Sequence, residues 1–291
     1  MNIKKWLNSN TTSLKGTTIA ITGSTGGLAQ HLVSFLANLG ANLILLNRNK
    51  EKTEKQIKEI SSLYPDVKIE FIPCDLANFE SVKNTTEKLK QKHIDILYLC
   101  AGVYNVKRYK TDLGYDNIFQ TNFVSHYYMV NELLPQLNNT NGKIVAVSSI
   151  AHNYSTIDEE DIDFSTRKKS SKVYGNSKRF LTFSLCELMK NQKATLAIVH
   201  PGVTLTEMTN HYPKAINWLV KVGIKILFPS PKKASLSLLK GIFESTINYS
   251  WIAPSRFNIW GFPKTQKIKG TNLEEVKTIF NISEKIYKDL L

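Results

Sequence analysis

The amino-acid sequence predicts an α/β protein built on a doubly wound parallel sheet of about seven strands, with helices on both faces. Three observations predict it. Short apolar runs of strand length alternate along the chain with longer stretches of helical periodicity. A glycine-rich turn joins the first run to the first helical stretch, and small or polar residues follow the ends of several later runs. In open parallel sheets, ligands bind beyond these strand ends.

The first unit of the chain is a strand, a glycine turn and a helix. Residues 17–22 (TTIAIT) are the strand, residues 23–29 (GSTGGLA) are the turn, and leucines at helical spacing continue to Leu39, just before Gly40. Such a turn lets a pyrophosphate approach the backbone at the positive end of a helix. The alternative is a tight connection without a ligand, because short glycine patterns also occur by chance.

The second strand, residues 42–46, ends at Asn47 and Arg48, where a dinucleotide fold contacts the adenosine ribose. An acid there would accept a hydrogen bond from a free 2′-hydroxyl, but the first acid downstream is Glu51. Arg48 instead offers a fork of donors for a phosphate. We therefore expect NADP(H) to be preferred over NAD(H). A solvated arginine at a strand end is the alternative.

The rest of the chain continues the alternation. Later strands are predicted at 67–74, 94–100, 143–148, 195–200 and 249–253, and longer helices at 116–137, 171–190 and 271–291. No linker or internal repeat divides the chain, so residues 1–291 are expected to form one Rossmann-like domain. The first fifteen residues lack a long apolar run and predict a short helix beside the sheet, not a signal peptide or an anchor.

Tyr174 and Lys178 are four residues apart in the stretch predicted as the helix 171–190. At helical pitch the two side chains share a face, and an ammonium beside a phenol favours the phenolate. Tyr174 is therefore a candidate proton donor. By itself the spacing is weak evidence, since twelve tyrosines in a lysine-rich chain give such a pair by chance. An apolar core position is the alternative for Tyr174.

Taken in order, these motifs resemble the short-chain dehydrogenase/reductase family, in its single-domain branch, over residues 15–254. The matching segments are the glycine turn (TGxxxGxG with Ala29 at the last glycine), Cys74-Asp75-Leu76, Cys100-Ala101-Gly102, Asn122, Ser148-Ser149, Tyr174-Gly175-Asn176-Ser177-Lys178, and Pro201-Gly202 with Thr206. Cys100 departs from the family's asparagine. The separation of Ser149 from Tyr174 is longer than in compact members and is similar to retinol-dehydrogenase-like and protochlorophyllide-reductase-like members. The charged residues 158–169 between them are expected to form a solvated loop.

The resemblance implies reversible hydride transfer between nicotinamide and a carbonyl or secondary alcohol. It implies that Tyr174 exchanges the proton and that Ser149 hydrogen-bonds the substrate oxygen. Lys178 would bind the ribose hydroxyls and favour the tyrosinate, and Asn122 would help hold a water that connects Lys178 to solvent. The implied cofactor contacts are Gly23, Ser24, Thr25, Gly27, Leu28, Arg48, Asp75, Leu76, Ala101, Gly102, Tyr174, Lys178, Pro201, Gly202 and Thr206. Two other function classes stay open, an epimerase-like relative acting on a nucleotide sugar and a non-catalytic NADP(H)-binding sensor.

Residues 203–230 follow the sixth strand and are expected to cover the substrate. Within them, 214–228 predicts a helix that is apolar except for one polar stripe, Asn217, Lys221 and Lys225. Three alternatives stay open for this helix: a lid over an apolar substrate, a helix lying on a membrane surface, and a buried subunit contact. Its fifteen residues are too few to span a bilayer. The expected substrate is an apolar, fairly bulky carbonyl compound or alcohol.

The composition limits the classes of binding partner, the metal sites and the cellular compartment that we expect. The formal net charge is +14, yet no basic stripe interleaved with aromatics and no nucleic-acid module occurs, so we expect a solvated basic surface, then anionic lipid, and nucleic acid last. Six histidines without paired spacing and no CxxC predict no metal site. Three widely spaced cysteines predict a reducing compartment, and hence a cytoplasmic protein with a membrane-peripheral alternative. A homodimer or homotetramer is implied by the resemblance alone.

Overall fold

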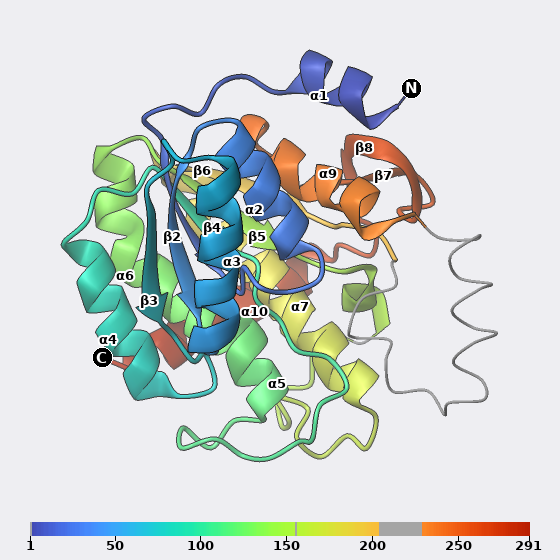
Figure 1. Ribbon diagram of the computed structural model, residues 1–291. Coiled ribbons are helices and arrows are strands. Elements are labelled where there is room, and N and C mark those ends of the chain that lie inside the picture. Colours follow the sequence, from blue (N-terminus) through green and yellow to red (C-terminus); the bar gives the residue numbers. More distant parts are fainter. Residues whose placement is uncertain (1, 155, 204–228) are drawn as a thin grey trace, which may run out of the picture.

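The computed structural model describes residues 2–154, 156–203 and 229–291, with an eight-stranded sheet at its centre (Figure 1). The strand order is β3-β2-β1-β4-β5-β6-β7-β8. Neighbouring strands are parallel except β7 and β8, which form an antiparallel hairpin. The strands are β1 (Thr18–Thr22), β2 (Asn42–Asn47), β3 (Ile69–Pro73), β4 (Ile96–Leu99), β5 (Lys143–Val147), β6 (Thr195–Val199), β7 (Ser250–Arg256) and β8 (Trp260–Lys267). The predicted doubly wound α/β fold is confirmed.

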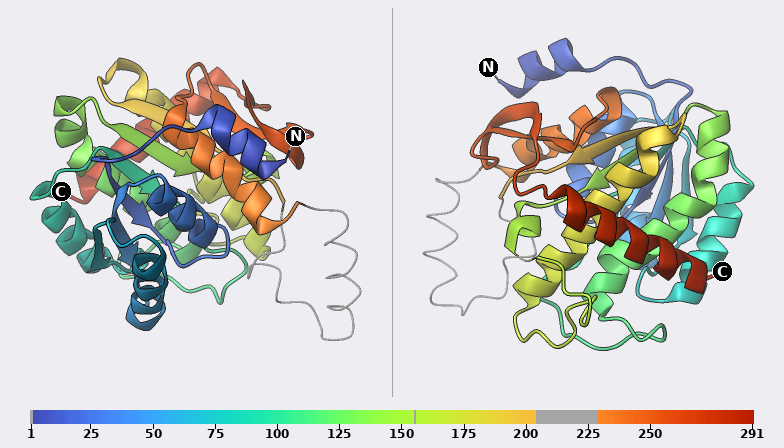
Figure 2. Two further views of the ribbon diagram at one scale, coloured as in Figure 1. Left: turned by 45° about the horizontal axis from the view of Figure 1, so that its top comes forward. Right: turned by 180° about the vertical axis from the view of Figure 1, so that it is seen from behind.

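Helices cover both faces of this sheet (Figure 2). One face carries α2 (Ala29–Asn38), α3 (Lys50–Leu63) and α9 (Pro231–Phe243), with α1 (Ile3–Asn10) packed against α9. The other face carries α4 (Phe79–Lys90), α6 (Ser125–Asn139), α7 (Ser170–Leu188) and α10 (Leu273–Asp289). Because the inner strands are covered on both sides, they are apolar along nearly their whole length.

The structure has eight strands where the sequence predicts about seven. The eighth, β8, has the sequence WGFPKTQK, and glycine, proline and lysine are all depleted in strands, so its pattern does not predict one. It forms because it pairs with β7 alone, at the edge of the sheet. An edge strand tolerates Pro263, since the outward side of its backbone needs no partner.

The helix predicted over 116–137 is three consecutive pieces. A short α5 (Asn117–Phe119) leads into a π-helical turn over Gln120–Val124, and α6 follows. Turns of this type occur often at functional sites because they displace a side chain from the helical register. The predicted N-terminal helix is confirmed as α1, in which Trp6 is 2% exposed. The predicted C-terminal helix is confirmed as α10.

The region expected to cover the substrate lies mostly outside the described residues. This applies to the predicted helix 214–228 and to Thr206, so the three alternatives for that helix stay open. Among the helices of the described ranges, none combines the length and apolarity needed to cross a bilayer.

Candidate active site

The glycine turn and the end of β4 approach each other closely. Gly23 has φ +68°, and a Cβ there would lie 2.7 Å from Cα of Ala101, so only glycine fits. The Thr22 hydroxyl accepts hydrogen bonds from the amides of Cys100 and Ala101, at 3.0 and 3.1 Å. Thr22 therefore fixes the backbone at the position where Cys100 departs from the family pattern. Sequence reasoning missed Thr22, which reads as an ordinary strand residue.

The residues around the turn fit a dinucleotide. Within the described residues, the amides of Gly27 and Leu28 donate no hydrogen bond to the protein, and no side chain caps α2. Unpaired amides at a helix N-terminus suit a pyrophosphate. Thr25 is half-buried beside them. Arg48 follows β2 and is exposed, where a guanidinium can reach a phosphate.

Ser24, predicted as a cofactor contact, has a fully buried side chain. Its hydroxyl accepts a hydrogen bond from Nδ2 of Asn47 and donates one to Oε1 of Gln56, both at 2.7 Å. These bonds tie the turn to β2 and α3. Any contact of Ser24 with a cofactor would therefore come from its backbone.

The other predicted cofactor residues lie where strands end. Asp75 is half-buried two residues after β3, and its carboxylate accepts a hydrogen bond from the amide of Ala77. Leu76 is 6% exposed and belongs to the apolar core, so its side chain faces inward. Pro201 and Gly202 follow β6. Gly202 has φ +86°, and a Cβ there would lie 3.0 Å from atoms of the β7–β8 region.

Lys178 lies beside the ends of β4 and β5. Its side chain is buried, and Nζ donates a hydrogen bond of 2.7 Å to the carbonyl of Val147 at the end of β5. A Cβ on Gly102 would lie 3.4 Å from Nζ, so a side chain at this position would crowd the ammonium. Burial lowers the pKa of Lys178 to about 8, and no carboxylate pairs with it in the described part of the chain.

Tyr174 lies one helical turn before Lys178, as the spacing predicts. The Lys178 ammonium is 6.0 Å from the centroid of the Tyr174 ring, and Tyr174 is half-buried. Tyr104, from the segment after β4, packs edge-on against the Tyr174 ring with centroids 5.1 Å apart. Ser149 is half-buried at the end of β5, and its hydroxyl accepts a hydrogen bond from the amide of Ala151 at 3.2 Å.

Asn122 is placed by the π-helical turn and is fully buried. Its side chain exchanges two hydrogen bonds with the backbone of Val103, at 2.8 and 3.0 Å, and donates a third to the Ser177 hydroxyl at 3.0 Å. The amide thus joins the segment after β4 to α7. These bonds support a positioning role for the Asn122 side chain. The predicted role in holding a water stays a prediction.

The charged residues 158–169 are in large part the solvated loop that the sequence predicts, since Glu159, Glu160, Arg167, Lys168 and Lys169 are exposed. Two acids of the loop are the exception. Asp161 and Asp163 are 9% and 8% exposed, and Asp163 accepts a hydrogen bond of 2.6 Å from the amide of Asp116. Arg108 joins this loop to the segment after β4. Its Nε donates to Asp116 at 2.7 Å, and its Nη atoms donate to three backbone carbonyls within 164–167. No sequence signal marks Arg108, because most of its partners are backbone atoms.

The comparisons with known proteins decide the family of this chain. The family model for short chain dehydrogenase matches residues 17–217. The chain belongs to the short-chain dehydrogenase family. Family membership makes it an NAD(P)-dependent oxidoreductase, in agreement with the resemblance found from the motifs. Among the described residues of this dehydrogenase, no group of three or more His, Cys, Asp or Glu could hold a metal ion.

Relatives agree with this assignment, and a solved structure shares the fold. An uncharacterized oxidoreductase of Schizosaccharomyces pombe is 32% identical over 82% of this chain and 76% of that protein. Human polyprenol dehydrogenase is 29% identical and human retinol dehydrogenase 13 is 30% identical, over 71% and 68% of this chain. The matches span 65% and 62% of those two proteins. A crystal structure of an uncharacterized protein from Mycobacterium Paratuberculosis shares the fold, with TM-score 0.75, 23% identity and 96% of each chain covered.

Proposed function

We propose that this dehydrogenase transfers a hydride between NADP(H) and a carbonyl or secondary alcohol of an apolar small molecule, with Tyr174 as general acid and base. The observation that carries the proposal is the buried Lys178 ammonium, held beside the Tyr174 ring without a carboxylate partner in the described residues. A lone positive charge in a poorly solvated place favours a negative charge on its neighbour. It therefore favours the tyrosinate that proton exchange requires.

Each residue has a separate task in this proposal. When bound, the nicotinamide supplies or accepts the hydride. Tyr174 gives the proton to the substrate oxygen or removes it, and the Ser149 hydroxyl donates a hydrogen bond to that oxygen. Lys178 also holds the ribose hydroxyls through the donors left over from its bond to Val147. Asn122 fixes the backbone of Val103, which fixes the wall of the site.

The preference for NADP(H) rests on Arg48. It is exposed directly after β2, and the acid nearest in the sequence, Glu51, is in the first turn of α3. Arg48→Asp is expected to lower the kcat/KM with NADPH and to raise the kcat/KM with NADH, because an acid repels the 2′-phosphate. Lys58→Asp, a charge change of the same size on α3, is the control. An unchanged ratio of the two kcat/KM values would refute the assignment.

The apolar substrate is supported by the side chains around Tyr174. Val103, Val106 and Tyr174 pack against a small buried cluster of Ile118, Phe164 and Val173. Tyr104 adds a second ring. The names of the human relatives, polyprenol dehydrogenase and retinol dehydrogenase 13, belong to proteins acting on apolar alcohols and fit the same class.

Turnover with the Tyr174→Phe variant tests the mechanism. The phenylalanine lacks the hydroxyl, so kcat should fall by at least about a hundred-fold, as expected for removal of a general acid. NADPH binding, followed by fluorescence, should change little. Retained turnover would remove Tyr174 from the mechanism. Tight NADPH binding by the wild type without turnover on any ketone, aldehyde or quinone would instead favour the sensor, and isomerisation of a nucleotide sugar would favour the epimerase.

Three further expectations stay predictions. The single domain over 1–291, the homodimer or homotetramer, and the cytoplasmic location with its membrane-peripheral alternative are tested by neither the fold nor the comparisons.

A further inference from the structure

The excess of positive over negative charge in this chain comes from two segments of the sequence. Residues 1–50 and 208–272 contain fifteen of the 38 lysines and arginines but only one of the 24 acids. The rest of the chain has equal numbers of the two signs. The net charge of +14 therefore belongs to these two segments alone. The solvated basic surface that the composition predicts is therefore uneven, because its excess of cations comes from these two segments.

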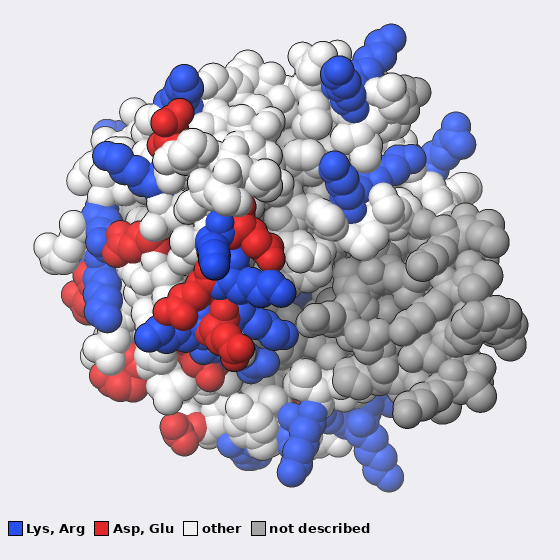
Figure 3. Space-filling view, viewed as in Figure 1, with Lys and Arg blue, Asp and Glu red and all other residues white. Residues whose placement is uncertain are grey.

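The fold brings parts of the two segments together. α1 contacts α9, and α9 contacts both strands of the β7–β8 hairpin. Figure 3 shows Lys and Arg side chains over this region without Asp or Glu among them, whereas both signs mix over the middle of the same view. We call the region the basic face; its described cations are Lys4, Lys5, Lys232, Lys233, Arg256, Lys264 and Lys267.

The cations of the basic face are not neutralised within the described part of the molecule. None of the seven forms an ion pair with a carboxylate there. Glu244 is the one acid within residues 1–50 and 208–272, and it pairs with Lys240. Lysines on the edge strand β8 discourage unwanted strand pairing. That explanation covers Lys264 and Lys267 but not the cations of α1 and α9.

An exposed aromatic side chain forms the tip of the hairpin. Phe257 is 84% exposed, and its backbone has φ +54°, followed by Asn258 at φ +59°. A bulky residue is disfavoured in this conformation, and a phenyl ring is disfavoured in water. Trp260, 38% exposed, packs edge-on to Phe257 with ring centroids 6.4 Å apart. A strained backbone and an exposed ring at the same residue indicate that Phe257 contacts another molecule.

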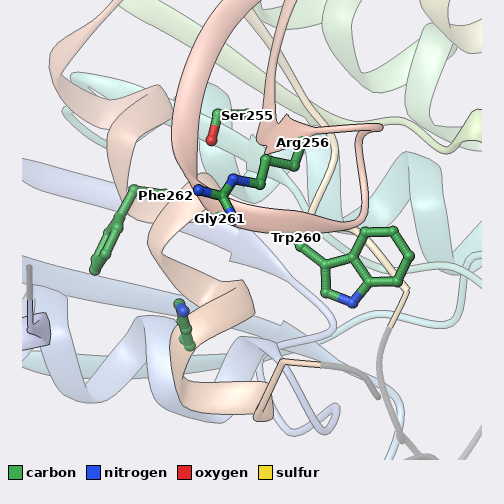
Figure 4. Close-up of a pocket in the computed structure, with 6 residues that line it drawn as sticks. Ser255, Arg256, Trp260, Gly261 and Phe262 are labelled. Carbon is green, nitrogen blue, oxygen red and sulfur yellow. The ribbon is translucent and has the colours of Figure 1, made fainter.

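A hollow between the hairpin and α9 lies beside these rings (Figure 4). Its volume is about 520 Å³, and it is lined by Lys233, Ser255, Arg256, Trp260, Gly261 and Phe262. Lys233 lies over the Phe262 ring, 5.2 Å from its centroid. The hollow thus combines two cations with two aromatic rings. It contains none of the residues predicted for catalysis or cofactor binding.

We propose that the basic face docks on the surface of an anionic lipid bilayer. Phe257 and Trp260 enter the interface between headgroups and acyl chains, the cations of the face meet the anionic headgroups, and the hollow receives a lipid phosphate. The charge of the face complements that of the lipid. Phe257 at the tip of the hairpin favours a lipid partner over nucleic acid, because the whole phenyl ring can be removed from water when it enters a bilayer. The residues of this surface are different from those of the predicted helix 214–228, which lies outside the described residues.

Sedimentation of the full-length protein with vesicles tests the proposal, without cofactor or substrate. Vesicles of phosphatidylcholine with phosphatidylserine should bind it, and binding should weaken as salt rises. Vesicles of phosphatidylcholine alone should bind weakly. Arg256→Glu with Lys264→Glu should lower the partition coefficient at least about ten-fold. Phe257→Asn should lower it about ten-fold without lowering Tm, since asparagine tolerates a positive φ.

Matched variants on α3 serve as controls. Lys55→Glu with Lys58→Glu makes the same change of charge, and Leu63→Ser removes an apolar side chain that is 66% exposed. Both should leave the partition coefficient within about two-fold of the wild type. Equal binding to both kinds of vesicle, an equal loss in the controls, or binding to DNA in preference to vesicles would overturn the proposal. Carbonyl reduction measured with a soluble substrate and without vesicles tests the proposed catalytic function independently of membrane binding.

Discussion

Replacing Lys178 by methionine should stabilise the protein near neutral pH. The side chain is 2% exposed, and burial lowers its pKa from the usual 10.5 to about 8. Below pH 8 Lys178 is protonated in both the folded and the unfolded chain. Because the unfolded chain binds this proton more tightly, burial of the ammonium lowers the free energy of unfolding by about 3 kcal/mol. Methionine fills a similar volume without the charge. It loses the hydrogen bond to the Val147 carbonyl, worth about 1–2 kcal/mol, so the net gain at pH 7 is about 1–2 kcal/mol.

The dependence of this difference on pH is the decisive measurement. A group whose pKa is lowered by folding binds more protons in the unfolded state, so wild-type stability rises as pH increases from 8 toward 10.5. Urea unfolding at pH 7 and at pH 10 should therefore show Lys178→Met more stable at pH 7 and equal or less stable at pH 10. Lys58→Met, at an exposed position on α3, should show no such change. A difference for Lys178→Met that is the same at both pH values would refute the assignment of a desolvated ammonium.

Two further predictions concern the contacts that hold the site together. Arg179 is 4% exposed and pairs with Glu275 of α10, so Arg179→Ala should lower the free energy of unfolding by about 3–5 kcal/mol because it removes the cation from a carboxylate that is only 11% exposed. The double replacement of Arg179 and Glu275 by methionine should restore most of that loss in urea unfolding. Arg108→Ala should raise the KM for the carbonyl substrate about ten-fold while the Kd of NADPH changes less than two-fold, because Arg108 positions Tyr104 and its loop and not the glycine turn. Equal effects on both constants would contradict that role.

Much of the fold could be predicted from the sequence because its signals are local. Each inner strand of the sheet is a short apolar run, and the glycine turn stands between β1 and α2 as expected. The α7 helix places Tyr174 and Lys178 one turn apart, as the spacing predicts. The edge strand β8 could not be predicted, since it depends on pairing with β7 and not on its own composition.

The hydrogen bonding of the site could not be predicted, because its partners are far apart in the sequence or are backbone atoms. Ser24 looks like a phosphate contact, yet its hydroxyl is used by Asn47 and Gln56. Asn122 looks like a polar residue facing a water, yet its amide is bonded to the backbone of Val103. Motifs therefore predicted the positions of a candidate site, while the hydrogen-bond partners of individual atoms needed the three-dimensional contacts.

The long separation between Ser149 and Tyr174 has a structural consequence. The loop within it turns back to Arg108, which fixes the segment after β4 only four residues from Tyr104. Tyr104 in turn rests on the ring of Tyr174. The loop that lengthens this interval thus supports the segment that carries Tyr104, and its buried Asp163 adds a hydrogen bond from the amide of Asp116. A shorter connection could still bring Ser149 and Tyr174 to the same end of the sheet, but it would leave the segment around Tyr104 without this support.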